Sequence, residues 1–241
     1  MSATDEELPE LQEISHEHPD VNGGWLRPAV FGAMDGLVSN FALIMGVTGG
    51  SSDTKPVIIA GLAGLVAGAC SMAAGEYTSV ASQRELAEAQ VDIEREEILD
   101  NEAAEEAELA AIFVSKGVDE ETARDVASQI HRDVDHAVAV HAAEEMGIDV
   151  DDLASPMLAA VSSFVSFSLG AVLPLIPLLL GLTSPWPTVV ISLLALFGCG
   201  ALVTRVTSRT WWYGGIRQLV LGGAAAGITY LIGEAIGTSV G

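Results

Sequence analysis

Residues 56–85 read PVIIAGLAGLVAGACSMAAGEYTSVASQRE, and the first twenty of them carry no charged side chain. About 20 apolar residues in a helix are enough to cross the ~30 Å hydrocarbon core of a bilayer. A chain in lipid must satisfy its own backbone hydrogen bonds, so a run of this composition crosses as a helix. The predicted span is 56–80, and four similar runs lie at 28–50, 157–181, 186–205 and 216–238. The sequence therefore predicts an all-α membrane protein with five transmembrane helices.

The charges are segregated from these runs. The chain has 241 residues, of which 50% are hydrophobic, yet its formal net charge is −23. Residues 82–155 hold twenty-two acids against five Lys and Arg, and residues 1–24 hold seven acids with no Lys or Arg. So negative a surface excludes nucleic acid as a partner. The predicted division is an acidic disordered tail (1–26), transmembrane helices 1 and 2 (27–81), an acidic helical domain (82–155), and transmembrane helices 3 to 5 (156–241).

The basic residues predict the orientation in the bilayer. Lys and Arg concentrate on the cytoplasmic side of membrane proteins. One side of the predicted topology carries only Lys55. The other side carries Arg27, Arg84, Arg95, Arg205, Arg209 and Arg217. We therefore expect a multi-pass protein with a cytoplasmic N-terminus and acidic domain and an outside C-terminus. Abundant acids with scarce Lys are typical of a salt-adapted prokaryote, which would place the protein in the plasma membrane.

Helix-ending signals divide the acidic domain. Asp100 and Asn101 offer a break and a new N-cap, and Gly117 and Gly147 are suited to the residue just after a helix end. Asp119 is a further N-cap. The predicted helices after the break are 102–116, about 120–130, and a last one that stops at Gly147.

The stretch EREEILDNEAAEEAEL, residues 94–109, contains eight carboxylates. Glu94 and Glu97 are three residues apart, as are Glu102 and Glu105, so each pair shares a helical face. Like charges at this spacing destabilise a helix, and a divalent cation would reverse that penalty. The last helix adds two pairs at a spacing of four, His141 with Glu145 and His131 with Asp135. Carboxylates with an imidazole favour divalent transition metals.

A solvated acidic face explains the same spacing, because a run of charges is usually surface. The spacing alone leaves both interpretations open. An enzyme with a ferritin-like di-iron centre needs Glu-x-x-His on two helices, and the chain has this pattern only at Glu13 and His16 in the tail. Nucleotide-binding and hydrolase motifs are absent from the sequence.

The predicted spans contain few ionisable side chains. Asp35 lies about two turns inside the first span, where a carboxylate costs roughly 2.5–3.5 kcal/mol on insertion scales and is by default a candidate for an ion pathway. The alternative is an interfacial aspartate hydrogen-bonded to Ser39. In the second span, small residues, a thioether and an acid share one helical stripe, formed by Gly64, Gly68, Met72 and Glu76. Close helix packing by the glycines and space-filling by Met72 would also explain this stripe.

Three strings carry a resemblance to a known family: FGAMDGLVSNFALIMGV, AGLAGLVAGACSMAAGEYTSVASQRE and FSLGAVLPLIPLLL. Together with the acidic insert between the last two, they resemble the vacuolar iron transporter family over residues 27–240. The resemblance implies five membrane helices per subunit and a homodimer with the ion path on its two-fold axis. It also implies proton-coupled export of Fe²⁺, and often Mn²⁺, from the cytosol for iron homeostasis, with no permanent cofactor and no enzymatic activity.

The resemblance also implies site residues. The metal ligands of a cytoplasmic binding domain would be Glu94, Glu97, Glu102, Glu105 and Glu145, with His141 where plant members have methionine. Asp35 and Met72 match the transport residues, and Glu76 is a candidate for a proton or metal role. Plant-type members have a carboxylate where this chain has Gly64, and an acid where it has Pro28, so these departures leave the coupling chemistry open.

The rival function is a membrane-anchored, non-transporting protein whose acidic domain buffers metal or docks a basic partner. An anchor has no need of a carboxylate inside a span, so Asp35 favours transport.

Overall fold

The computed structural model describes residues 24–205 and 209–240, and these residues form helices with no strand among them. The predicted disordered tail, 1–26, lies outside the described residues except for its last three. The α-helices are α1 (Leu26–Gly50), α2 (Thr54–Ser115), α3 (Glu120–Ile130), α4 (Val134–His141), α5 (Pro156–Val172), α6 (Ile176–Leu179), α7 (Trp186–Val203) and α8 (Trp211–Val240). A π-helical turn, η1, spans Ala142–Met146, and a 3₁₀ turn, η2, spans Leu173–Leu175.

Five helical stretches are long and apolar enough to cross a membrane, which confirms the predicted number. They are α1, the first part of α2, α5 with its continuation through η2 and α6, α7, and α8. The third stretch changes from α to 3₁₀ geometry at Pro174, because proline has no N–H to donate and its ring crowds the preceding turn.

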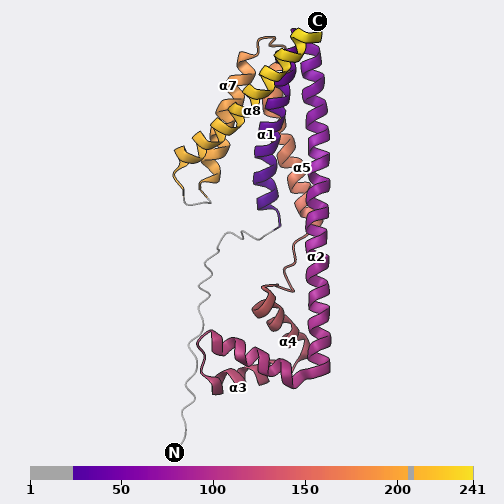
Figure 1. The fold of residues 1–241 in the computed structure, drawn as a ribbon, viewed down its shortest axis with the longest axis vertical. Coiled ribbons are helices and arrows are strands. Elements are labelled where there is room, and N and C mark those ends of the chain that lie inside the picture. Colours follow the sequence, from indigo (N-terminus) through magenta and orange to yellow (C-terminus); the bar gives the residue numbers. More distant parts are fainter. Residues whose placement is uncertain (1–23, 206–208, 241) are drawn as a thin grey trace, which may run out of the picture.

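Helix α1 is the centre of the membrane part, packed between α5 and α8 with α2 alongside (Figure 1). Glycine permits the close approach to α5: a Cβ on Gly36 would lie 2.2 Å from the carbonyl oxygen of Phe167. On the opposite side, the Thr229 hydroxyl of α8 donates to the Ala42 carbonyl at 2.6 Å. Leu37 and Phe41 of α1 form a buried cluster with Leu196 and Ala226.

Helix α2 continues far beyond the apolar stretch and then bends sharply (Figure 1). The bend is at Asn101, whose backbone angles of φ −146° and ψ 46° are not helical. This confirms the break expected at Asp100 and Asn101. Gly117 and Gly147 have positive φ, at 99° and 67°, and follow the helix ends as predicted. The Asp119 carboxylate caps α3 by accepting from the Thr122 N–H at 3.0 Å.

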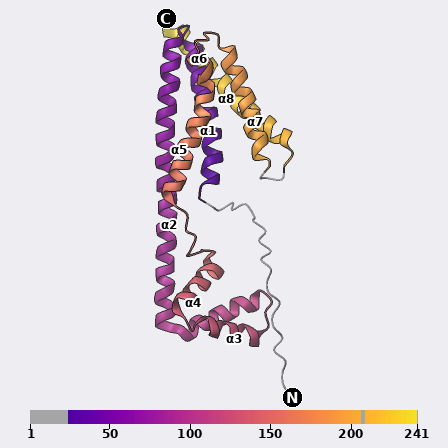
Figure 2. The same cartoon turned by 180° about the vertical axis from the view of Figure 1, so that it is seen from behind.

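Residues 82–155, hereafter the insert, fold on a small apolar core of their own. Leu109 and Ala110, after the bend in α2, pack with Ala123 and Ala127 of α3. Before the bend, Ile98 packs with Ala137 and Val138 of α4. These contacts fold the chain back on itself, so that α4 lies beside α2 at the end of the molecule where α1 begins (Figures 1 and 2).

Candidate metal sites

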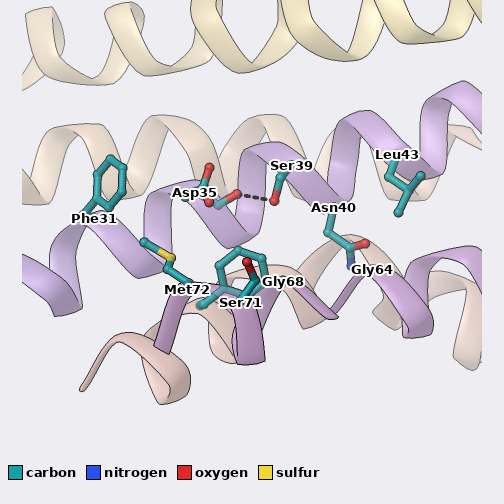
Figure 3. A pocket seen from close by; sticks show the side chains of 10 residues that line it. Phe31, Asp35, Ser39, Asn40, Leu43, Gly64, Gly68, Ser71 and Met72 are labelled. Atoms are coloured by element: carbon teal, nitrogen blue, oxygen red, sulfur yellow. Dashed lines mark hydrogen bonds between the residues drawn. The ribbon is translucent and has the colours of Figure 1, made fainter. Parts of the chain in front are cut away.

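A cavity of about 390 Å³ lies between α1 and α2 inside the membrane part (Figure 3). Its lining combines oxygen, sulfur and apolar groups. From α1 come Phe31, Asp35, Ser39, Asn40 and Leu43, from α2 Gly64, Gly68, Ser71 and Met72, and from α5 Phe167. The two helices run in opposite directions, so the start of α1 faces the end of the apolar stretch of α2. The fold thus brings Asp35 and Met72 into one cavity, which their spacing in the sequence does not predict.

The Asp35 carboxylate has no protein partner among the described residues, and the side chain is exposed on the surface of the single chain. The Ser39 hydroxyl donates to the backbone carbonyl of Asp35 at 2.6 Å, rather than to the carboxylate (Figure 3). The hydrogen bond that would have satisfied an interfacial aspartate is therefore not formed.

Four other residues singled out from the sequence lie on the helices that form this cavity, and two of them line it. Gly64 and Gly68 line it and allow close packing, because a Cβ would lie 2.4 Å from Leu43 Cδ2 at Gly64 and 2.3 Å from the Phe167 ring at Gly68. Glu76, one turn beyond Met72 toward the insert, is outside the lining and half-buried. Pro28 is buried near the start of α1, where its carbonyl accepts from the Ser166 hydroxyl at 3.4 Å. The structure therefore brings neither Glu76 nor Pro28 to the cavity.

In the insert, Glu94, Glu105 and His141 each offer a ligand atom within 4.8 Å of the others. They come from the two parts of α2 on either side of the bend and from α4. Glu145, in the following π-helical turn, accepts from His141 Nδ1 at 2.6 Å. The bend at Asn101 makes this meeting possible, because it turns the second part of α2 back across the face that carries Glu94. We refer to Glu94, Glu105, His141 and Glu145 as the insert cluster.

The hydrogen bonds leave two polar atoms of the insert cluster without a partner. His141 is fully buried, and its Nδ1 lies 2.6 Å from Glu145 Oε1 and 3.0 Å from Glu94 Oε1. One N–H serves one acceptor well, and within the described part of the chain the buried Glu94 Oε1 and His141 Nε2 have no hydrogen-bond partner. With Nδ1 as the donor, Nε2 carries a lone pair. Carboxylate oxygens and an imidazole within one cluster fit a divalent transition metal.

Burial and neighbouring negative charges raise the pKa of two carboxylates of the insert cluster. Burial, followed by the charge of Glu145 and then of Glu105, raises the pKa of Glu94 to about 7. The pKa of Glu105 is raised as well, first by its own burial and then by Glu108, while His141 opposes the shift. A bound divalent cation would stabilise the ionised carboxylates and release the proton.

The remaining predicted ligands differ in position. Glu97 is exposed, but its charge raises the pKa of both Glu94 and Glu105. Glu102 is exposed at the bend and is not part of the insert cluster. Glu108 is exposed, yet its charge raises the pKa of both Glu94 and Glu105. The sequence analysis did not single out Glu108, although its spacing of three from Glu105 places the two carboxylates on the same helical face.

The second imidazole pair of the sequence is not formed. Asp135 pairs instead with Arg95 at 2.6 Å, on the surface, which links α4 to α2. His131 is buried, its Nδ1 donates to the Ala127 carbonyl at 2.9 Å, and its ring stands edge-to-face with His141 at 5.2 Å between centroids. His131 thus packs beside His141 and limits its movement.

The five spanning helices, a carboxylate and a thioether in one intramembrane cavity, and the insert cluster define a class: an integral, multi-pass α-helical membrane protein that presents ligands for divalent metals. Comparison with known proteins agrees. The family model of the VIT family matches residues 26–234. A vacuolar iron transporter of Acanthamoeba castellanii is 35% identical over 223 residues, covering 92% of this chain and 78% of that protein.

Two rice proteins are similar to the chain over comparable lengths. The vacuolar iron transporter homolog 1 of Oryza sativa subsp. japonica is 33% identical over 211 residues, or 86% of this chain and 71% of its own length. The vacuolar iron transporter 1 of the same species is 27% identical over 229 residues, or 92% and 91%. The chain belongs to the VIT family. It is therefore a metal transporter of the lipid bilayer and not an enzyme, as the sequence predicts.

Proposed function

We propose that the protein exports Fe²⁺ from the cytosol, with Mn²⁺ as a second substrate, in exchange for protons, and so limits cytosolic iron. The observation that carries this proposal is the intramembrane cavity, where Asp35 and Met72 lie together (Figure 3). A soft thioether beside the hard carboxylate oxygen favours a transition metal such as Fe²⁺ over Mg²⁺ or Ca²⁺, which prefer oxygen ligands alone, and the carboxylate also suits Mn²⁺.

The exposure of Asp35 supports a homodimeric path. A carboxylate on the lipid-facing surface of an apolar span is costly unless another surface covers it. A second copy packed against α1 and α2 would convert the open cavity into a closed one with two carboxylates and two thioethers. The same carboxylates would bind the metal cation and a proton alternately, which would couple metal export to proton entry.

The insert supports a capture step. It lies at the end of the molecule where α1 begins, and Asp35 is in the third turn of α1 (Figures 1 and 2). With the basic residues on that side, we place the insert and the N-terminus in the cytosol and the C-terminus outside. The insert cluster would bind the metal and deliver it to the cavity, and the exposed carboxylates of Glu97 and Glu102 would attract the cation without binding it tightly. For the acid-rich, Lys-poor chain we propose the plasma membrane of a prokaryote, whereas the relatives are named as vacuolar.

Family membership and the unpartnered Asp35 both favour transport over the rival, a membrane-anchored metal buffer or docking protein. Liposomes that contain the purified protein and a metal-sensitive dye test the proposal. We expect Fe²⁺ or Mn²⁺ uptake that alkalinises the lumen in step with the metal, since protons leave in exchange, and that Asp35→Ala abolishes. Glu234→Ala, a change of an exposed acid near the other end of the fifth span, is the matched control and should transport normally. Undiminished uptake by Asp35→Ala would refute the role of this carboxylate.

A further inference from the structure

Asn40 is a buried polar residue in the wall of the membrane cavity. It lies on α1 five residues beyond Asp35, further from the insert, and only 2% of its surface is exposed. Because α1 rises 1.5 Å per residue, the two positions are roughly 7.5 Å apart along the helix axis. Asn40 is thus displaced along the path from the Asp35 and Met72 end of the cavity.

The hydrogen bonds fix how the Asn40 amide is oriented. Its Nδ2 donates to the backbone carbonyl of Ala171 on α5 at 2.6 Å. A carbonyl only accepts, so the nitrogen must be on that side and the amide cannot be reversed. The oxygen, Oδ1, consequently faces the other way.

The Asn40 oxygen faces α2 and has no partner. A Cβ built on Gly64 would lie 3.1 Å from Asn40 Oδ1, and Figure 3 shows the amide reaching from α1 toward Gly64. Oδ1 is buried and has no hydrogen-bond partner among the residues that the structure describes. A buried acceptor left unpaired is destabilising, and most such atoms in proteins are paired. The oxygen is therefore held in place by α5 while its lone pairs remain available in the cavity.

Glycine in α2 lets the two helices approach closely at this oxygen. A Cβ on Gly64 would lie 2.4 Å from Leu43 Cδ2 as well as 3.1 Å from Asn40 Oδ1, and at Gly68 a Cβ would lie 2.3 Å from the Phe167 ring. The Phe167 ring therefore lies beside α2 between the Asp35 end of the cavity and the Asn40 end. The cavity thus has two ends with oxygen groups, one on each side of an aromatic ring.

We propose that the amide oxygen of Asn40 is a ligand of the transported divalent cation, at a second position beyond Asp35 and Met72 on the way out of the cytosol. This inference rests on the proposed transport function and adds a residue to the path. A neutral carbonyl oxygen suits a position that the cation must leave, since it binds without a full opposing charge. The Nδ2 hydrogen bond to α5 orients the ligand before the cation arrives.

Mn²⁺ uptake into liposomes tests the proposal with a rescue across the two helices. Removing a group that acts on a metal typically costs about 10–100-fold in affinity or activity, so Asn40→Ala should lower Mn²⁺ uptake at least about tenfold. Adding Gly64→Asp to that variant supplies an oxygen at the same place from α2 and should restore most of the uptake. Asn40→Ala with Gly64→Ala is the matched control, because it adds the carbon without the oxygen, and should stay inactive. Ser163→Ala removes another buried, unpaired oxygen outside the cavity and should transport normally.

The alternative is that Asn40 only braces α5 through the Ala171 carbonyl. In that case Gly64→Asp, which cannot replace the Nδ2 donor, would not restore uptake, and the proposal would be overturned. Uptake unchanged in Asn40→Ala would overturn it as well. If Asn40→Ala is not monodisperse by gel filtration, Asn40→Ser replaces it, since a short hydroxyl is closer in size to the amide but does not extend to Gly64.

Equilibrium binding separates this inference from the proposed function. Electron paramagnetic resonance of Mn²⁺ is measured on the full chain in detergent, with Glu94→Gln and Glu105→Gln present to remove the insert cluster. Asn40→Ala should weaken the remaining Mn²⁺ binding about tenfold. If the protein without substitutions does not transport Mn²⁺, the proposed function is wrong. The ligand role of Asn40 is decided separately, because equal Mn²⁺ affinity with and without Asn40→Ala would overturn it in either case.

Discussion

Glu94 should make metal binding by the insert depend on pH near neutrality. Its pKa is raised from 4.5 to about 7 by burial and by neighbouring carboxylates. A carboxylate must lose its proton to bind a metal. With a pKa of about 7, roughly ten of every eleven molecules are ionised at pH 8 and roughly one of eleven at pH 6. The single proton therefore weakens metal binding about tenfold between these pH values, whereas an ordinary glutamate would be ionised at both.

The perturbation is Glu94→Gln, which keeps the shape of the side chain but neither binds a proton nor carries a charge. Calorimetric titration with Mn²⁺ is carried out on the full chain in detergent, in an Asp35→Ala background that removes the membrane cavity from the measurement. At pH 8 we expect Glu94→Gln to bind about 10–100-fold more weakly. The loss of Mn²⁺ affinity between pH 8 and pH 6 should be about one tenth as large a factor in Glu94→Gln as in the parent, because the variant lacks the Glu94 proton.

Glu96→Gln is the matched control, because Glu96 is exposed and two residues away in the same helix. It should keep both the affinity and the pH dependence of the parent. The reasoning is refuted if the parent binds Mn²⁺ equally well at pH 6 and pH 8, or if Glu94→Gln retains the full pH dependence.

Three further predictions concern stability and ligand choice. Glu94 binds its proton more tightly in the folded protein than in the unfolded chain, so the metal-free insert should lose stability as the pH rises from about 4.5 to about 7. The loss should reach roughly 3 kcal/mol. Thermal unfolding in the presence of a chelator should show a smaller pH dependence for Glu94→Gln. In calorimetry, Glu105→Gln should weaken Mn²⁺ binding at least about tenfold and Glu102→Gln less than about threefold, since only Glu105 is in the insert cluster. Equal losses of affinity in the two variants would contradict this assignment. Gly36→Ala forces a Cβ to 2.2 Å from a backbone carbonyl oxygen of α5, so it should lower the free energy of unfolding by about 1–3 kcal/mol and lower the melting temperature in detergent. Gly75→Ala is the control and should leave the melting temperature unchanged, since a Cβ there would have no described atom within 4 Å.

The helices of the insert show how far local chemistry predicts structure. The caps and breaks depend on residues next to one another in the chain: Asn101 interrupts α2, Asp119 caps α3, and Gly117 and Gly147 take the left-handed conformation after a helix. These features form wherever the helix ends, so the sequence predicts them. Residues 1–23, for which the composition predicts a disordered acidic tail, lie outside the described residues, and that prediction stays a prediction.

The sites are a different matter. Regular spacing assigns Glu94 with Glu97 and Glu102 with Glu105 to helical faces, but it does not say which faces meet. The angle of the bend at Asn101 and the packing of α4 bring Glu105 and His141 to Glu94 and leave Glu102 in solvent. The resemblance to the VIT family names these residues as one group without distinguishing them.

The sequence by itself determined the class of protein and its five spans, because length and apolarity decide whether a helix is stable in lipid. It also determined where the helices of the insert begin and end, because caps and glycines act over a few residues. Only the tertiary structure decided which side chains face a common space. Asp35 meets Met72 because α1 and α2 are antiparallel neighbours. The Asn40 oxygen faces the cavity because a carbonyl of α5, 131 residues away in the chain, holds the amide nitrogen.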